Sequence, residues 1–402
     1  MDVINKFDGT VLGEVEMDTP RAGKSTKETL IEPLSVVNIL LEELSSMLND
    51  EGMMRVYSCE TGKSISSCRR EVEFSKLYLL SYAYPEIYRY FGHGRLLTSA
   101  FRNTRRAYIH RGIPILSMCM ELIDSIGKGQ KIEIIHPAEN PMATMTLTEK
   151  LVDSIHGYDH ILEETAIGST ANIQSSRFNP QDTISVWGKG RKITSLKPEI
   201  DVRYRSAGNF SSIVRDHSQV EKAVNASMNL SFNSISNIGF SGQVYFIPDR
   251  EFIYFKNRLS EMLKRTAPKL YSPDSGVNYY SGKSEVEKSK DSVKHLLENG
   301  WDYVDDLPAT VHVLTLQYGE IPEIIPEING PIILLAHYAS LKESADMALK
   351  MWNPSLLNMY TDSINDVEYM KQRFGSSLEI CVNGMDERDI FHKALINPFS
   401  YS

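Results

Sequence analysis

The sequence has few cysteines, no excess of basic residues and no long apolar run, and each absence excludes a class of protein. With 43 lysine and arginine residues against 52 aspartate and glutamate residues, the net charge of −9 argues against a nucleic-acid-binding protein. No apolar run approaches the roughly 18 residues that a membrane-spanning helix requires. Residues 1–10 lack the basic and then apolar layout of a signal peptide. We therefore expect a cytoplasmic protein that binds neither nucleic acid nor a membrane.

The four cysteines are scattered along the chain, at Cys59, Cys68, Cys119 and Cys381. Their spacing matches neither a metal site nor the framework of a disulfide-rich domain. The simplest interpretation is a reduced protein without a metal centre. Its length of 402 residues is sufficient for two domains, each with its own core.

A further absence is that of a nucleophile in residues 221–248, the segment on which the functional interpretation of the chain depends. The segment begins with apolar residues at helical spacing and ends in a β-rich run. Between them, residues 232–242 are rich in Asn, Ser and Gly. A helix–turn–strand of this kind can present a nucleophile at the bottom of a cleft, but here the turn has no thiol, imidazole or carboxylate. Its remaining candidates are hydroxyl groups with no evident base beside them, those of Ser234, Ser236 and Ser241.

Local patterns predict the first elements of the chain. An Asp-Gly turn between two short β-like runs predicts a hairpin within residues 1–20. Apolar residues at helical spacing predict one helix over 29–49 and a second over 64–82. Both helices are expected to pack in a core and to carry no chemistry. Farther along, a helix is predicted over 250–265, and a polar surface loop that enters a helix over 272–294.

Residues 86–111 are rich in tyrosine and arginine although the chain is acidic. We expect an exposed arm or a subunit contact, and an anion site is the alternative. The arginines of this segment are Arg89, Arg95, Arg102, Arg105, Arg106 and Arg111.

The next residues show the alternation of helix and strand that is typical of an open α/β sheet. Residues 111–141 predict a helix, a Gly-rich turn, a strand at Ile132–Ile135 and a polar loop, which is where such sheets place ligands. Residues 165–174 and 183–193 are each a β-like run followed by glycine and small or basic residues, a layout that can offer backbone N–H groups to a phosphate. A single further strand is expected over 200–214.

Two of these segments carry a resemblance to a known family. DVINKFDGTVLGEV at residues 2–15 and CETGKSISSCRREVEFS at residues 59–75 resemble, in order and spacing, the "INPxDGxxIGEV" hairpin and the "ETGKPxxEAxxEV" helix start of the aldehyde dehydrogenase superfamily. The resemblance implies an α/β fold with a Rossmann-type dinucleotide-binding domain over residues 1–204, to which 385–402 return. A second, catalytic-type α/β domain is implied over 205–384. In that family neither of the two matching segments touches the chemistry.

The resemblance also implies positions for a nicotinamide cofactor, NAD or NADP. Glu139 matches the acid that binds the adenosine ribose, and His136 stands where the family has a lysine; an ordinary solvated loop acid is the alternative for Glu139. Trp187 and Gly188 resemble the pyrophosphate turn of the fatty-acyl reductase branch. The neighbouring basic side chains either bind phosphate or form a solvated turn; they are Lys189, Arg191 and Lys192.

Near the C-terminus the "ExFGP" frame is kept by Glu327, Gly330 and Pro331, so Glu327 takes the position that binds the nicotinamide ribose. Asn383 matches the residue that ends the last core strand, and a buried thiol is expected for Cys381. The "GVVxxITPW" strand of the family has no evident counterpart before Arg111. Past residue 384 the chain has only 18 residues, which puts the usual substrate-channel wall and subunit exchange in doubt.

The catalytic residues of the family are replaced at three positions together. Gly112 stands in place of the asparagine that polarises the aldehyde oxygen, Arg205 in place of the general-base glutamate, and Ile238 at about the position of the nucleophilic cysteine. A guanidinium cannot accept a proton near neutral pH; a strand arginine paired with an acid elsewhere is the alternative for Arg205. Three hypotheses follow. The first is a catalytically silent member kept for ligand binding or for assembly, as a homo-oligomer or with an active partner enzyme. The second is an active NAD(P)-dependent oxidoreductase that acts on an aldehyde or acyl thioester with a non-standard site, and the third is a scaffold without a ligand.

Overall fold

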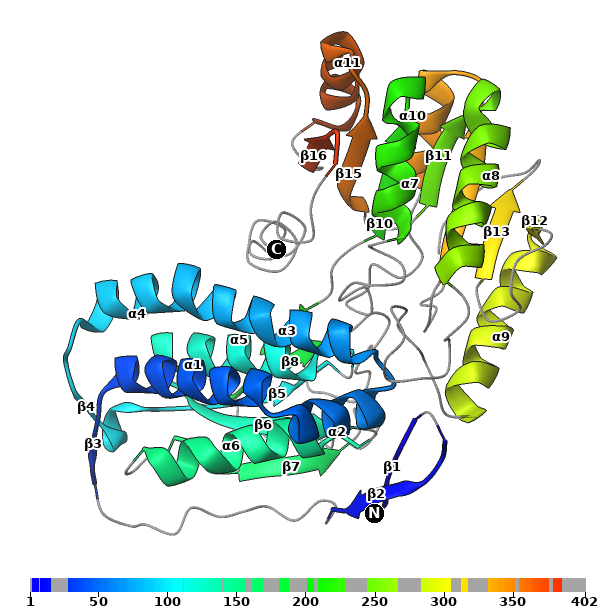
Figure 1. The fold of residues 1–402 in the computed structure, drawn as a ribbon. Helices are drawn as coiled ribbons and strands as arrows, with labels where there is room; N and C mark the ends of the chain where they lie inside the picture. Colours follow the sequence, from blue (N-terminus) through cyan, green and yellow to red (C-terminus); the bar gives the residue numbers. More distant parts are fainter. Residues whose placement is uncertain are drawn as a thin grey trace. The chain divides into compact units, whose positions relative to one another are not determined.

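Helices and strands alternate along most of the chain in the computed structural model (Figure 1). The strands are β1 (Asp2–Ile4), β2 (Val11–Glu14), β3 (Leu30–Ile31), β4 (Leu96–Leu97), β5 (Thr104–Tyr108), β6 (Lys131–Pro137), β7 (Glu164–Gly168), β8 (Thr183–Trp187), β9 (Asp201–Arg205), β10 (Asn209–Val214), β11 (Val244–Pro248), β12 (Trp301–Tyr303), β13 (His312–Leu316), β14 (Ile332–Tyr338), β15 (Pro354–Tyr360) and β16 (Glu379–Val382). The α-helices are α1 (Pro33–Asn49), α2 (Glu51–Thr61), α3 (Ile65–Tyr78), α4 (Tyr84–Phe91), α5 (Pro114–Gly127), α6 (Met142–Ser154), α7 (Val220–Met228), α8 (Asp249–Thr266), α9 (Lys283–Glu298), α10 (Leu341–Lys350) and α11 (Ile364–Phe374).

The chain divides into two units, Met1–Arg205 (unit 1) and Ser206–Ser402 (unit 2). The boundary predicted from the sequence lay between residues 204 and 205, and the predicted return of 385–402 to the first domain lies outside the described residues. The structure describes residues 2–6, 8–15, 28–110, 112–138, 140–155, 161–162, 164–168, 181–187, 201–205, 209–228, 244–266, 283–304, 312–316, 332–350, 354–375 and 379–384.

The N-terminal part of unit 1 contains the predicted hairpin and helices, with additions. The hairpin is confirmed as β1 and β2. The first helix, α1, begins only at Pro33, because residues 30–31 form β3 and pair with β4. Helix α2, which the sequence analysis missed, starts where Asp50 accepts a hydrogen bond from the Met53 N–H (3.0 Å). It ends at Gly62, whose left-handed φ of 73° favours glycine.

The larger sheet of unit 1 has five parallel strands in the order β7-β6-β5-β8-β9 (Figure 1). Its central strand, β5, corrects two predictions. A strand does precede α5, although the sequence analysis found none there. The arginine-rich segment is also not an exposed arm throughout: Arg105 lies on β5 and is fully buried, whereas Arg89, Arg95 and Arg102 are exposed. The β-like runs predicted at 132–135, 165–174 and 183–193 are confirmed as β6, β7 and β8.

Unit 2 contains a seven-stranded sheet in the order β12-β13-β14-β11-β10-β15-β16, in which only the edge strand β12 is antiparallel. The strand predicted over 200–214 is therefore wrong as one element: β9 belongs to the sheet of unit 1 and β10 to that of unit 2. The predicted helix over 250–265 is α8, and the helix expected after the polar stretch is α9.

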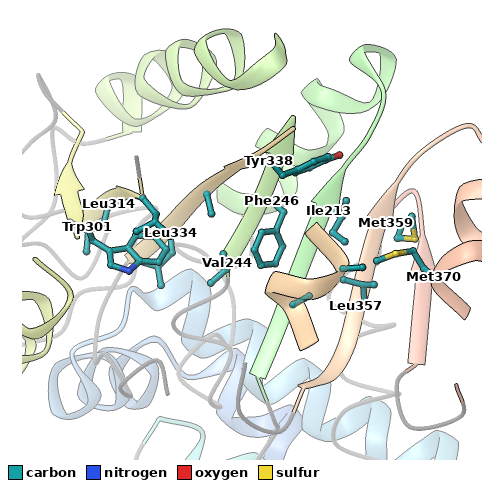
Figure 2. Packing of buried hydrophobic residues seen from close by; sticks show 14 of the residues in the cluster. Ile213, Val244, Phe246, Trp301, Leu314, Leu334, Tyr338, Leu357, Met359 and Met370 are labelled. Atoms are coloured by element: carbon teal, nitrogen blue, oxygen red, sulfur yellow. The ribbon is translucent and has the colours of Figure 1, made fainter. Parts of the chain in front are cut away.

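Both faces of the unit 2 sheet are covered, which explains why β11 and β13 are buried at every position. One face packs against α7 and α8 through Val224, Phe255 and Leu259. The other packs against α9, α10 and α11, and Figure 2 shows Met370 of α11 beside Met359 and Leu357 on this face. The mixed α/β fold with a Rossmann-type unit and a second α/β unit is confirmed.

Candidate functional site

The strand order of unit 1 defines where a ligand is expected. The chain runs from the central strand β5 through α5 to β6 and through α6 to β7, and then continues on the other side of β5 with β8 and β9. The order therefore reverses between β5 and β8. In open parallel sheets, ligands bind outside the carboxyl ends of the strands at such a point. The residues after β5, β6 and β8 are therefore the candidate site.

The N-terminus of α5, which follows β5, is already occupied by a carboxylate from α3. Glu71 Oε1 accepts hydrogen bonds from the backbone N–H groups of Ile115 (3.0 Å) and Leu116 (3.2 Å). Its other oxygen accepts from the Tyr57 hydroxyl (2.5 Å) and from Lys63 Nζ (2.6 Å). All these groups are buried. A helix N-terminus attracts anions, but this one is satisfied from within the fold.

The N-terminus of α6, which follows β6, is satisfied in the same way. The two oxygens of Glu60 accept hydrogen bonds from the backbone N–H groups of Met142 (2.8 Å) and Ala143 (3.0 Å). Burial raises the pKa of Glu60 to about 7, against the effect of these two hydrogen bonds, which lower it. Both capping acids and Lys63 belong to the segment that resembles the family motif. The segment thus has a structural role, as the resemblance implied.

A third acid, Glu121 of α5, binds the end of β8. Its Oε1 accepts hydrogen bonds from Ser185 Oγ (2.6 Å) and from the indole N–H of Trp187 (2.8 Å), and its Oε2 accepts from Arg105 (3.0 Å). Arg105 also contacts Asp124. Burial alone would lower the pKa of Arg105, but the carboxylates of Glu121 and Asp124 raise it above its ordinary value.

Gly112 and His136 are the two predicted site residues whose surroundings the structure describes. Gly112 lies between β5 and α5, and its backbone N–H donates to His110 Nδ1 (2.9 Å). Without a side chain it offers no replacement for the missing asparagine amide. His136 lies on β6, fully buried, with its Nδ1 2.8 Å from Thr144 Oγ1. This is an arrangement typical of a core histidine, and cofactor binding by His136 stays a prediction.

The other predicted positions follow described strands or fall outside the described residues. Arg205 ends β9, and its side chain is outside the described residues. Glu139 follows β6, and Gly188 and Lys189 follow β8; these three are themselves outside that range, as are Ile238 and Glu327. Their roles stay predictions, as do those of Arg191, Lys192 and the serines of the 232–242 turn.

Two residues near the candidate site escaped the sequence analysis. His110 lies two residues after the end of β5 and is buried. Since its Nδ1 accepts the N–H of Gly112, the neutral ring carries its proton on Nε2. The other residue is Glu121, whose partners lie 16 to 66 positions away in the sequence. Recognising β5 as a strand would have placed His110 at its carboxyl end, whereas no local signal marks Glu121.

All four cysteines are buried, and none is in a disulfide. Burial raises the pKa of the Cys119 thiol on α5 and that of Cys59, and it raises the pKa of Cys68 to about 12. The thiolate is the nucleophilic form of cysteine, so these three thiols are unreactive near neutral pH. Cys381 lies on β16 and its thiol is buried, as expected.

Within the residues that the structure describes, no group of three or more metal-ligating side chains is close enough to hold a metal ion. Among the same residues, no helix is long and apolar enough to cross a membrane.

No protein-family model matches the chain. Over 379 residues it is 22% identical to the 3-sulfolactaldehyde dehydrogenases of Priestia aryabhattai and Priestia megaterium, a match that covers 85% of this chain and 78% of each relative.

Solved structures match nearly the whole chain. Lactaldehyde dehydrogenase from Escherichia coli has a TM-score of 0.74 at 16% identity and covers 96% of this chain and 88% of its own. Aldehyde dehydrogenase 21 from Physcomitrella patens, solved with the product succinate, has a TM-score of 0.73 at 16% identity and covers 95% and 86%. The NAD-dependent benzaldehyde dehydrogenase of Corynebacterium glutamicum has a TM-score of 0.73 at 13% identity and covers 96% and 91%.

Proposed function

We propose that this chain, which has the fold of the aldehyde dehydrogenases, is a divergent member of that superfamily that binds NAD or NADP and has lost thiol-dependent aldehyde oxidation. Solved structures of aldehyde dehydrogenases match this chain along 95–96% of its length, and they confirm the resemblance inferred from the sequence.

One observation carries the proposed loss of activity. Oxidation of an aldehyde in this fold requires a thiolate that forms a thiohemiacetal, from which the hydride leaves to the nicotinamide. The chain has four thiols in total, and every one of them is buried inside a unit. The position expected for the nucleophile is held by Ile238, and the neighbouring positions offer only hydroxyl groups.

Cofactor binding is supported by the strand order of unit 1 and by the chemistry that follows β8. Of the three loops at the candidate site, those after β5 and β6 enter helices whose N-terminal N–H groups already bind Glu71 and Glu60. The loop after β8 begins with Gly188 and Lys189, a glycine and a basic residue of the kind that binds phosphate. These residues would hold the pyrophosphate, and Glu139 would bind the adenosine ribose.

The nicotinamide, when bound, would supply a hydride acceptor or donor. The chain's own residues would bind and orient it, but an oxidising reaction would still lack the covalent step. The expected result is a protein that holds the dinucleotide without sustained turnover of aldehydes.

A titration with NAD and NADP followed by thermal unfolding tests the binding. A ligand present at a hundred times its Kd and bound only to the folded state stabilises it by about 2.7 kcal/mol. Lys189→Ala should weaken the effect, whereas Lys371→Ala, which changes an exposed lysine of α11, should leave it unchanged. If neither cofactor raises the unfolding temperature, the scaffold hypothesis replaces this proposal.

An activity assay tests the proposed loss. We expect no sustained reduction of NAD or NADP with lactaldehyde, 3-sulfolactaldehyde or a simple aldehyde, the first two chosen from the relatives. Steady production of reduced cofactor would overturn the proposed inactivity, and its abolition by a thiol-alkylating reagent would then identify the nucleophile as a cysteine.

A second candidate function is favoured by His110. Near the carboxyl end of β5 the Nδ1 of this residue accepts a hydrogen bond from the N–H of Gly112, and reduction of a carbonyl needs no thiol. Hydride would pass from reduced cofactor to the carbonyl carbon and a proton to its oxygen. Aldehyde-dependent oxidation of NADPH or NADH that is lost in His110→Phe would support this activity, and its absence in the unmodified protein would exclude it.

A further inference from the structure

An exposed apolar surface of unit 1 is formed by the helical segment before β4 and by the two-stranded β3–β4 ribbon (Figure 1). Helix α3 continues through a π-helical turn, η1 (Leu79–Ala83), into α4. Four apolar or aromatic side chains of these elements are 46% to 55% exposed, those of Leu30, Leu80, Tyr88 and Leu97. Exposed apolar side chains that are scattered singly are normal, so the question is whether these four lie together.

The two leucines lie side by side on the ribbon. Leu30 of β3 and Leu97 of β4 are directly opposite each other in the antiparallel pair, and cross-strand partners of this kind place their side chains on the same face. Ile31, the next residue on β3, points to the opposite face and is buried. The ribbon therefore packs one face on the unit and leaves the leucine face to the solvent.

The helical segment adds a line of side chains that reaches this ribbon. Leu80, Tyr84 and Tyr88 follow one another at intervals of four residues, which keeps them on one side of the helix. The rings of Tyr84 and Tyr88 are stacked with their centroids 6.3 Å apart. Tyr88 also meets the ring of His93 edge-on at 5.7 Å, and His93 Nδ1 lies 3.4 Å from Oε1 of Glu32. Because Glu32 directly follows β3, these contacts join the tyrosines to the ribbon.

Charged side chains of both signs border this surface. The exposed Glu28 and Arg95 each lie two positions before one of the two leucines, Leu30 and Leu97. The exposed Glu86 and Arg89 lie on α4 beside the tyrosines. Two acids and two arginines are therefore available at the border of an apolar and aromatic centre. We call this centre the tyrosine–leucine surface; it consists of Leu30, Leu80, Tyr84, Tyr88 and Leu97.

The mixture of signs decides which kind of partner fits. A uniformly acidic or uniformly basic partner would place like charges against two of the four bordering side chains, which is unfavourable. A second copy of this chain, related by a twofold axis, brings the same two acids and two arginines, so that opposite signs can face each other. It also brings the same apolar centre, and both copies would bury it.

We propose that the tyrosine–leucine surface is the interface of a twofold-symmetric homodimer of this chain. An apolar, tyrosine-containing centre with a charged rim is the usual composition of a protein–protein interface, and arginine and tyrosine are enriched there. The interface contains none of the residues of the candidate site. The proposal therefore goes beyond the proposed function and does not depend on it.

The mass of the protein in solution is the first test. Sedimentation equilibrium should give twice the 45.5 kDa of the chain at high protein concentration and should approach 45.5 kDa on dilution. Tyr88→Glu and Leu97→Glu each place a carboxylate in the buried centre and should weaken the dimer by about tenfold or more. The matched control is Ile253→Glu, which changes a side chain of α8 in unit 2 that is 62% exposed and should leave the dimer unchanged.

Two charge-segregated variants test the pairing across the twofold axis. The double variant Glu28→Arg with Glu86→Arg makes all four bordering charges positive, and Arg89→Glu with Arg95→Glu makes all four negative. Each variant alone should dimerise more weakly than the unmodified protein, because like charges meet. An equimolar mixture should form a heterodimer. Since all four side chains are exposed, both variants should fold, and urea unfolding checks this.

Several outcomes would overturn the proposal. The unmodified protein could remain a monomer at every concentration, or it could form an open-ended assembly, which requires a head-to-tail contact. A dimer that Tyr88→Glu and Leu97→Glu leave intact would place the interface elsewhere. If those two variants do not fold, the charge-segregated variants decide: a mixture that associates no better than either variant alone would show that the acids and arginines do not face each other.

Discussion

The two units each contain a parallel sheet with a point where the strand order reverses, and the two points differ in what their side chains bind. In unit 1 the point lies between β5 and β8, and in unit 2 between β10 and β15. Strand order alone marks both as places where a ligand can bind. The side chains around each point distinguish one point from the other.

In unit 2 the segments after β10 and β15 bind each other. Asp216, just after β10, accepts hydrogen bonds from the Thr361 hydroxyl (2.9 Å) and the Asp362 N–H (2.8 Å), just after β15. Asp362 in turn accepts from Ser218 and Gln219, both at 2.6 Å. These polar groups thus bind one another across the point where the strand order reverses.

In unit 1 the bonds across the reversal point run through the helix layer. Glu121 on α5 binds Trp187 at the end of β8, so this bond joins a helix to the end of a strand. The same topology thus supports two segments that bind each other in unit 2. In unit 1 it supports, in our proposal, a cofactor-binding site. Four predictions test this difference between the two units, from the largest expected effect to the smallest.

Removal of the buried guanidinium should give the largest loss of stability. Arg105→Met leaves Glu121 and Asp124 without their shared partner, and breaking a buried ion pair costs about 3–5 kcal/mol. The corresponding change in unit 2, Arg215→Met, breaks a partly exposed pair with Asp366 and should cost about 1 kcal/mol or less. Urea unfolding measures both, and equal losses would contradict the contrast between the units.

Glu60 should make the stability of the protein depend on pH. Its pKa is about 7 in the folded state against an ordinary value of 4.5, so the folded protein binds more protons between these values. The stability from this group is present at pH 4.5 and is lost as the pH rises through 7, by up to about 3 kcal/mol. Glu60→Gln should remove this decline, which urea unfolding at pH 5 and pH 8 measures. A decline of the same size in the variant would assign it to another group.

Asp216→Ala should lower stability without changing cofactor affinity. The variant loses two hydrogen bonds at the reversal point of unit 2, which costs about 1–3 kcal/mol. Titration calorimetry with NAD and NADP should give the Kd of the unmodified protein. A clear loss of cofactor affinity in Asp216→Ala would break the comparison, because it would place the ligand site at unit 2.

The thiols of both units should be unreactive in the folded protein. Cys59, Cys68 and Cys119 in unit 1 and Cys381 in unit 2 are all buried. A colorimetric thiol reagent should release no signal before unfolding and should detect all four thiols in denaturant. Rapid reaction of one thiol in the folded state would identify an accessible cysteine and weaken the proposal that thiol chemistry is lost.

The sequence predicted the elements whose signals are local. The hairpin within residues 1–20, α5, β6 and the β-like run of β8 each follow from turn residues or from apolar spacing. The strand β5 was missed, because Arg105 and Arg106 on it look like surface residues until their partners are known: Glu121 for the first and Glu133, at 2.5 Å, for the second. Helix α2 was missed as well, since its start depends on a side-chain cap at Asp50.

The candidate site was predictable only in its chain positions. Resemblance singled out Gly112, His136 and Trp187, and only the structure shows that they lie at or just after the ends of β5, β6 and β8, which the strand order of unit 1 brings to one edge of the sheet. It did not predict that Glu60 and Glu71 would occupy the helix N-termini beside them. Those acids meet their N–H partners across 44 to 83 positions of sequence.

The sequence by itself determined what this protein can contribute chemically: four thiols, an isoleucine where a nucleophile is expected and a net charge of −9. These are properties of composition and position, and they are the same in any fold. The tertiary structure alone decided that every thiol is buried, that Arg105 lies at the centre of a sheet and that Glu121 binds Trp187. The physical reason is that burial and charge pairing depend on groups far apart in the chain, which only the packing of strands and helices brings together.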